Sequence, residues 1–190
     1  DNGKFDAMNK GISLASGHYT LFINSGDELY FSPCFERLIK NIHKFDDGFI
    51  IYGDVIIEVG KRRYLSSAPI ESEITKSKLK LPAHPAIFYP TNFLRQNPYD
   101  GQMHVSADTK LFLQAIKYLH LRKLDCPIAV FQIGGISTTQ TTLKEVISVW
   151  RERHLARHSN VNSKAHLLKM VLKMLFVKFF GYEIYHVISF

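Results

Sequence analysis

Residues 6–28 read DAMNKGISLASGHYTLFINSGDE and combine three local patterns that together indicate one fold class. Apolar residues recur at helical spacing up to Ala15, and Gly17 stands where a helix would end. The run Tyr19–Ile23 is short and rich in aromatic and branched residues, as expected of a strand buried on both faces. A polar loop follows at 24–28. In open α/β sheets ligands bind where strands end, so this order predicts an α/β domain with its site at this loop.

The loop combines a glycine with two carboxylates. Gly26 permits a tight bend, and Asp27 and Glu28 follow it directly. Divalent cations such as Mg²⁺ take carboxylate oxygens together with substrate phosphates as ligands. The residues alone therefore predict a site for a hard cation and a phosphate group at the end of the strand.

The same stretch resembles the centre of the family 2 glycosyltransferases that build bacterial surface polysaccharides. The resemblance rests on the Asn-Lys-Gly run at 9–11, the strand after it and the acidic loop at 24–28. It implies a mixed, mostly parallel sheet flanked by helices, of the GT-A type, and Mg²⁺ or Mn²⁺ held by Asp27 and Glu28. The residues it places on the nucleotide-sugar donor are Asn9, Lys10, Asn24, Ser25 and Asp27.

Two of these donor-side positions leave alternatives open. Asn24 stands where the family often has its first acid, and an amide brings no negative charge to a cation. Lys10 either pairs with a phosphate as a point charge or is a solvated helix lysine.

His84 and Asp108 are the candidates for the acceptor side. His84 precedes a short strand at 86–89 that has a proline directly before and directly after it. The resemblance places a histidine here beside the acceptor, although Pro85 replaces the usual Gln and a structural histidine is the alternative. From the residues alone, Asp108 is a cap or dipole partner of the helix that follows it. The resemblance implies instead that Asp108 is the catalytic base that deprotonates the acceptor hydroxyl, with Ala107 in place of a first acid.

The remaining elements follow from local signals. Ser32-Pro33 predicts a helix start, and residues 49–52 predict a buried strand ending at Gly53-Asp54. Asp54 lies either near the site or in a solvated turn. A hairpin is expected around Gly60-Lys61, and a last strand at 126–133, closed by a Gly-Gly-Ile-Ser turn. The two cysteines, Cys34 and Cys126, are expected to be small buried hydrophobic residues, which fits a reducing compartment.

Charge divides the chain into two parts. The 190 residues carry a formal net charge of +7, and after Trp150 seven basic residues face two acidic ones. We expect a partial catalytic domain at 1–150 and a basic amphipathic helical tail at 151–190, with polar linkers at 138–142 and 159–163. The run at 164–180 is too short and too charged for a membrane span, so an interfacial helix is predicted, with a helix packed on the core or another chain as the alternative.

The first residues of the chain lack a portion that the resembled family has. The chain opens at Asp1 without an initiator Met or signal peptide, and nothing corresponds to the first β-α-β portion of the resembled family. We therefore expect an N-terminally truncated piece whose sheet exposes an edge, which favours pairing with another chain, including a second copy.

The residues and the resemblance bear on three function classes. The favoured one is a metal-dependent, inverting glycosyltransferase that acts on a lipid-linked or polysaccharide acceptor at the cytoplasmic face of the membrane. The alternative is an inactive remnant that binds only a membrane or a partner. A nucleic-acid binder is not expected, because the basic residues lie among Leu, Met and Phe and no recognition motif is present.

Overall fold

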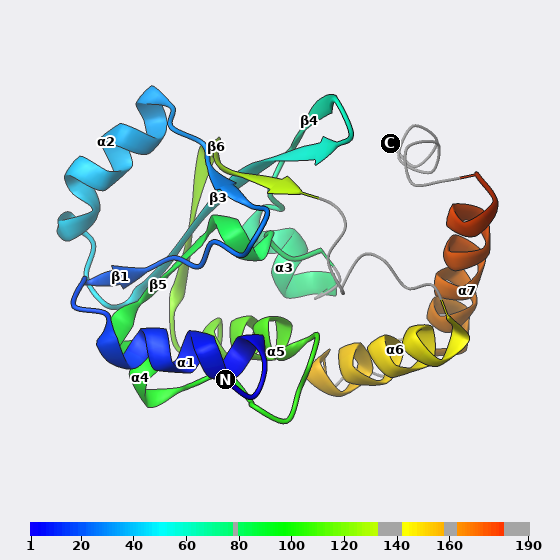
Figure 1. Ribbon diagram of the computed structural model, residues 1–190. Helices are drawn as coiled ribbons and strands as arrows, with labels where there is room; N and C mark the ends of the chain where they lie inside the picture. The colour runs from blue at the N-terminus through cyan, green and yellow to red at the C-terminus, as the bar shows by residue number, and fades with distance from the viewer. Residues whose placement is uncertain (78–79, 133–141, 158–162, 181–190) are drawn as a thin grey trace.

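The computed structural model describes residues 1–77, 80–132, 142–157 and 163–180 and has a mixed sheet with helices on both faces (Figure 1). The strand order is β1-β5-β3-β6-β2, and β4 pairs with β3 off this path. The strands are β1 Tyr19–Thr20, β2 Glu28–Leu29, β3 Phe49–Val59, β4 Arg62–Ser66, β5 Ile87–Pro90 and β6 His120–Gln132. The predicted α/β class and mixed sheet are confirmed.

The pairing directions differ from the prediction. Among the described strands, β3 and β6 run parallel along most of their length, whereas β1–β5, β2–β6, β3–β4 and β3–β5 are antiparallel. The expectation of a mostly parallel sheet is therefore wrong in this detail. A short turn explains the antiparallel β3–β4 hairpin, whereas the other antiparallel pairs join strands far apart in the sequence, whose direction local signals do not specify.

The helices divide between the two faces of the sheet (Figure 1). They are α1 Lys4–Leu14, α2 Pro33–Asn41, α3 Glu71–Ser77, α4 Thr91–Gln96, α5 Ala107–Ala115, α6 Leu143–Arg157 and α7 Ser163–Phe180, with 3-10 turns at Ile42–Lys44 and His84–Ala86. Ser32 caps α2 as predicted, since its side chain accepts a hydrogen bond from Phe35 N at 3.1 Å.

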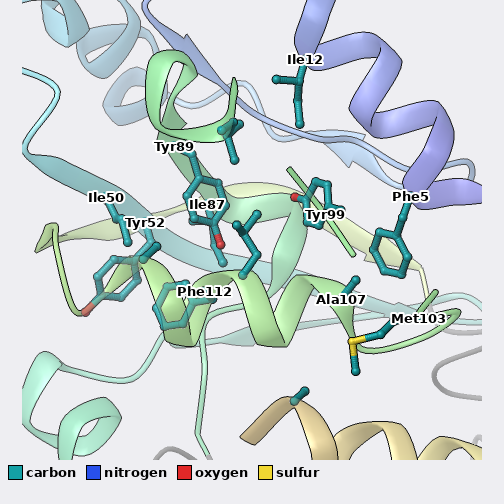
Figure 2. Close-up of a cluster of buried hydrophobic side chains, with 14 of the residues drawn as sticks. Phe5, Ile12, Ile50, Tyr52, Ile87, Tyr89, Tyr99, Met103, Ala107 and Phe112 are labelled. Atoms are coloured by element: carbon teal, nitrogen blue, oxygen red, sulfur yellow. The ribbon is translucent and has the colours of Figure 1, made fainter. Parts of the chain in front are cut away.

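Alternating strand residues build two cores. Ile50 and Tyr52 of β3 pack with residues of α1, α4 and α5, whereas Ile51 packs with Phe35 and Leu38 of α2. Figure 2 shows the first core, with Phe5 of α1 and Phe112 of α5 reaching it from opposite sides. This alternation is what a sheet covered on both faces requires.

The first strand is shorter and less buried than predicted. β1 covers only Tyr19 and Thr20, both half-buried, and Ile23 is 37% exposed. Because β1 lies at the end of the strand order, β5 is its one partner among the described strands. The chain then crosses to the opposite end of the sheet, where β2 pairs with β6.

The predicted end of a strand at Gly53-Asp54 is also wrong. β3 continues to Val59, with an irregularity in its pairing to β6 at this point. Asp54 is buried, accepts a hydrogen bond from Ala68 N at 2.8 Å and lies 3.7 Å from Lys123 Nζ. Its carboxylate therefore holds the following loop and does not lie in a solvated turn.

Gly53 fills a position with no room for a side chain. A Cβ there would lie 2.7 Å from the carbonyl oxygen of Cys126 and 2.7 Å from Ile128 Cγ1. We expect Gly53→Ala to lower the free energy of unfolding by about 1–3 kcal/mol, because the β3–β6 pair must separate. Gly11→Ala is the matched control, since its Cβ would meet nothing within 4 Å, and in mid-helix it should stabilise by about 0.5–1 kcal/mol. Urea unfolding of both variants measures the contrast, and equal stabilities would contradict the packing argument.

The two cysteines are joined, contrary to the prediction. Cys34 at the start of α2 and Cys126 in β6 form a disulfide with a Cα–Cα distance of 6.3 Å. The expectation of burial holds for Cys126 but not for Cys34, which is half-buried. The pairing joins positions 92 residues apart, so local sequence carried no sign of it.

The C-terminal helices form a small third core. Val146 and Val149 of α6 pack with Met170 of α7 and with Val105 just before α5. The predicted domain boundary after Trp150 falls inside α6 and stays a prediction. No helix within the described ranges combines the length and the apolar character that crossing a membrane requires. The predicted Gly-Gly-Ile-Ser turn lies outside the described residues, as do most of the linkers at 138–142 and 159–163 and the end of the tail from 181 on.

Candidate functional site

His84 and Asp108 line one small cavity. His84 comes from the 3-10 turn before β5, and Asp108 from the first turn of α5. The cavity measures about 30 Å³, roughly the room of one water molecule. Its lining is completed by Leu81, Pro82, Ile87, Thr109 and Phe112. The structure therefore brings together the predicted acceptor-side histidine and the predicted base, although they are well separated in the chain.

Tyr99 is a member of this cluster that the sequence did not single out. Its hydroxyl lies 3.0 Å from His84 Nε2, and its ring belongs to the first core, between α1 and β5 (Figure 2). The stretch around it has the composition of a turn, because Asn, Pro, Asp and Gly surround it. An aromatic residue in the middle of a polar turn was the one local sign that Tyr99 is buried.

Asn9 positions Tyr99. The Asn9 amide donates to the Tyr99 carbonyl at 2.9 Å and accepts from the Tyr99 N–H at 2.9 Å. Both polar atoms of the side chain are thus used by one backbone segment 90 residues away. The predicted donor contact of Asn9 stays a prediction, but its observed role is to fix the turn that carries Tyr99.

Phe22 connects the cluster to the acidic loop. Its ring stacks on His84 with centroids 5.6 Å apart and meets Tyr99 edge to face at 5.4 Å. Asn24, where the acidic loop begins, is only two residues further along the chain. The segment that contacts His84 and Tyr99 through Phe22 therefore continues directly into the acidic loop.

Burial dominates the electrostatics of the cluster. It lowers the pKa of His84; the Asp108 charge opposes this effect, and Lys4 adds to it. Burial also raises the pKa of Tyr99 and of Tyr89 well above the usual range, assisted by the negative charge of Asp108. At neutral pH the cluster thus contains a neutral imidazole and two neutral phenols.

The lowered pKa of His84 gives a stability prediction. Below the ordinary value of about 6.5, the unfolded chain binds a proton that the folded chain does not, so stability falls as pH drops below that value. The slope from this one group approaches about 1.4 kcal/mol per pH unit until the folded-state pKa is reached. We expect His84→Gln to flatten the urea-unfolding profile between about pH 7.5 and 5.5, while the exposed His43→Gln leaves it unchanged. An unaltered slope in His84→Gln would contradict the assignment.

Asp27 is held beside the last residue of β6, where β2 pairs with that strand. Its Oδ1 accepts from Gln132 N at 3.2 Å, and its own N–H donates to Asn24 O at 3.0 Å. Partial burial raises the pKa of Asp27, against the lowering effect of hydrogen bonds from Gln132 and Asn24. Gly26 has a φ of 94°, and a Cβ there would meet Gln132 Oε1 at 2.7 Å, so glycine is required at this bend. The predicted tight bend before the acid is confirmed.

The other predicted ligand, Glu28, is placed differently. Its side chain is exposed, and its charge acts on Arg63 of β4. Nowhere in the described ranges do three His, Cys, Asp or Glu side chains gather as a metal centre. Magnesium commonly uses one or two protein carboxylates together with substrate phosphates. The donor set therefore fits a cation that arrives with a diphosphate and is held by Asp27, and a contact of Glu28 with that cation stays a prediction.

The remaining donor-side residues have ordinary surface contacts. Lys10 Nζ lies 2.7 Å from Asp1 and 2.9 Å from Asp6 on the exposed side of α1. Ser25 is exposed and Asn24 half-buried in the loop. These contacts agree with the solvated alternative for Lys10, and its contact with a phosphate stays a prediction.

Comparison with known proteins finds relatives by sequence. No protein-family model matches the chain. Proteins of Mycobacterium tuberculosis and Mycobacterium bovis, both named PGL/p-HBAD biosynthesis glycosyltransferase, are 29% identical to it over 143 residues. Those alignments cover 73% of this chain and 55% of each relative, so the chain spans about half the length of the curated relatives it matches.

A solved structure shares the fold. The crystal structure of S. aureus TarS in complex with UDP-GlcNAc superposes with a TM-score of 0.54 at 15% sequence identity. The superposition covers 94% of this chain and 54% of that one. The chain is thus related to named glycosyltransferases and has the fold of a protein that was crystallised with a nucleotide sugar.

Proposed function

We propose that the chain acts in a glycosyltransferase reaction that transfers a sugar from a nucleotide-sugar donor to a hydroxyl of a cell-surface glycan or its lipid-linked precursor. The observation that carries this proposal is the shared cavity of His84 and Asp108 beside the segment that leads to Asp27. The names of the curated relatives support the same reaction class.

In the proposed reaction Asp108 is the base. Its carboxylate takes the proton of the acceptor hydroxyl, the oxygen attacks the anomeric carbon, and the bond from that carbon to the diphosphate oxygen breaks. One displacement of this kind inverts the anomeric centre. The neutral His84, held by Tyr99 and stacked on Phe22, would orient the acceptor by a hydrogen bond.

Asp27 would hold Mg²⁺ or Mn²⁺ on the donor diphosphate. Such a cation supplies Lewis-acid neutralisation of the leaving group when bound. The carboxylate is already partly desolvated and oriented by Gln132 N, so it needs little rearrangement to bind a cation. UDP-GlcNAc, the ligand named for the TarS structure, is the first donor to test.

The proposal includes a membrane contact through α7. This helix exposes Leu168, Leu172, Leu175 and Phe179, spaced four, three and four residues apart, while Met170 packs against α6. Exposed Lys169 and Lys178 accompany the apolar stripe, as in helices that lie on anionic membranes. We extend the proposal to a cytoplasmic position on the inner face of the membrane, and the same stripe in a second copy is the alternative partner.

Product formation tests the function. The chain is incubated with Mn²⁺, a panel of nucleotide sugars and an extract of lipid-linked glycan acceptors, and nucleotide diphosphate release is followed. Acceptor-dependent release with at least one donor is the expected result. A folded sample that binds vesicles but turns over none of the donors would favour the binding-only alternative.

A further inference from the structure

A second cavity lies between α5 and α6, separate from the His84–Asp108 cavity. It measures about 340 Å³. Lys110 and Gln114 of α5 line it, together with Lys117 beyond that helix and Arg157 at the end of α6. The lining is completed by Leu113, Tyr118 and Ala156. Three cationic side chains therefore share one hollow that the proposed reaction does not use.

Arg157 is the unusual member of this group. Its Nε is buried and has no hydrogen-bond partner. Burial lowers the pKa of Arg157, and the neighbouring charge of Arg153 lowers it further. Buried donors in folded proteins are normally paired, so the unpaired Nε–H means that Arg157 loses no hydrogen bond there if its guanidinium turns towards an acceptor in the hollow it lines.

The surrounding charges favour a negative ligand. Lys110 is the one partly neutralised cation among the three, since its Nζ lies 2.7 Å from Asp100. No carboxylate of the described residues forms an ion pair with Lys117 or Arg157. Two uncompensated cations with a planar donor fork suit a tetrahedral oxyanion, because a guanidinium binds phosphate oxygens in pairs.

We propose that the hollow between α5 and α6, lined by Lys110, Lys117 and Arg157, is a binding site for a phosphate group. The group belongs either to a soluble phosphate compound or to the headgroup of an anionic lipid. The site is independent of the proposed transferase activity, because none of its residues takes part in the His84–Asp108 cavity or the Asp27 loop.

The test compares two probes on the full chain and four variants. Inorganic phosphate is titrated calorimetrically at low ionic strength without divalent metal, and vesicles of phosphatidylglycerol or phosphatidylcholine are sedimented with the protein. Arg157→Gln is expected to weaken binding of phosphate, of phosphatidylglycerol vesicles or of both by about tenfold, and Lys117→Gln by a smaller factor. Lys61→Gln in the β3–β4 turn removes the same charge elsewhere and should change neither. Asp27→Asn should also change neither, which separates this site from the donor loop.

The two probes identify the source of the phosphate group. Loss of phosphate binding in Arg157→Gln indicates a soluble compound, whereas loss confined to phosphatidylglycerol vesicles indicates a lipid headgroup. Thermal unfolding of Arg157→Gln should occur no earlier than in the wild type, because the variant removes an unpaired buried donor. Equal binding of both probes by the wild type and Arg157→Gln would overturn the proposal.

Discussion

Asp108→Asn is expected to reduce sugar transfer by about a hundredfold to ten-thousandfold, the range that a positioned general base contributes. The carboxamide can still accept the Thr109 N–H that Asp108 Oδ1 now accepts at 2.7 Å, but it cannot take a proton from the acceptor hydroxyl. The unfolding transition should therefore stay near that of the wild type while turnover is lost. Initial rates at saturating donor and acceptor measure the effect.

The matched control is Asp125→Asn. Asp125 is an exposed carboxylate of β6 whose contact is with Lys123 at 2.6 Å, away from the cavity. Its loss should leave the rate within about a factor of two of the wild type, as expected of a weak surface ion pair. Comparable rates for Asp108→Asn and Asp125→Asn would remove Asp108 from the reaction.

Asp27→Asn is expected to abolish the metal-dependent part of donor binding, whereas Glu28→Gln leaves it nearly intact. The two acids are neighbours in sequence, but Asp27 is half-buried and bonded to Gln132 N, whereas Glu28 is exposed. The amide that replaces the Asp27 carboxylate keeps an acceptor for Gln132 N and removes only the charge that a divalent cation needs. Titration of UDP-GlcNAc in the presence of Mn²⁺ compares the pair.

Proton competition gives the same site a pH dependence. Burial raises the pKa of Asp27, so metal-dependent donor binding should weaken on acidification at a higher pH than an ordinary aspartate with a pKa near 3.8 would give.

Equal loss of binding in Asp27→Asn and Glu28→Gln would show that both acids share the cation, as the sequence first suggested.

Local sequence was sufficient for the helices and turns. α1 and the Ser32-capped α2 depend on apolar spacing and capping residues within a few positions, and both are where the sequence placed them. The strands needed more than local information. The shortness of β1 follows from its place at the end of the strand order, and the continuation of β3 past Gly53 follows from its contact with β6.

The candidate site shows the same division. The likeness to glycosyltransferases singled out His84 and Asp108, and the fold brings them into one cavity. The sequence did not single out Tyr99, because its position beside His84 depends on contacts with Asn9, 90 residues away, and with the ring of Phe22. Asp27 and Glu28 differ in burial at the point where β2 pairs with β6. This pairing joins residues about 100 positions apart, so the local sequence could not predict the difference.

Calorimetric titration of the 190-residue chain with UDP, in Mn²⁺ and in EDTA, tests the central claim most directly. The account predicts that a folded sample binds UDP in Mn²⁺, loses this binding in EDTA, and loses it equally in the Asp27→Asn variant. Absence of binding in Mn²⁺, or binding that EDTA and the Asp27→Asn substitution leave unchanged, would contradict it.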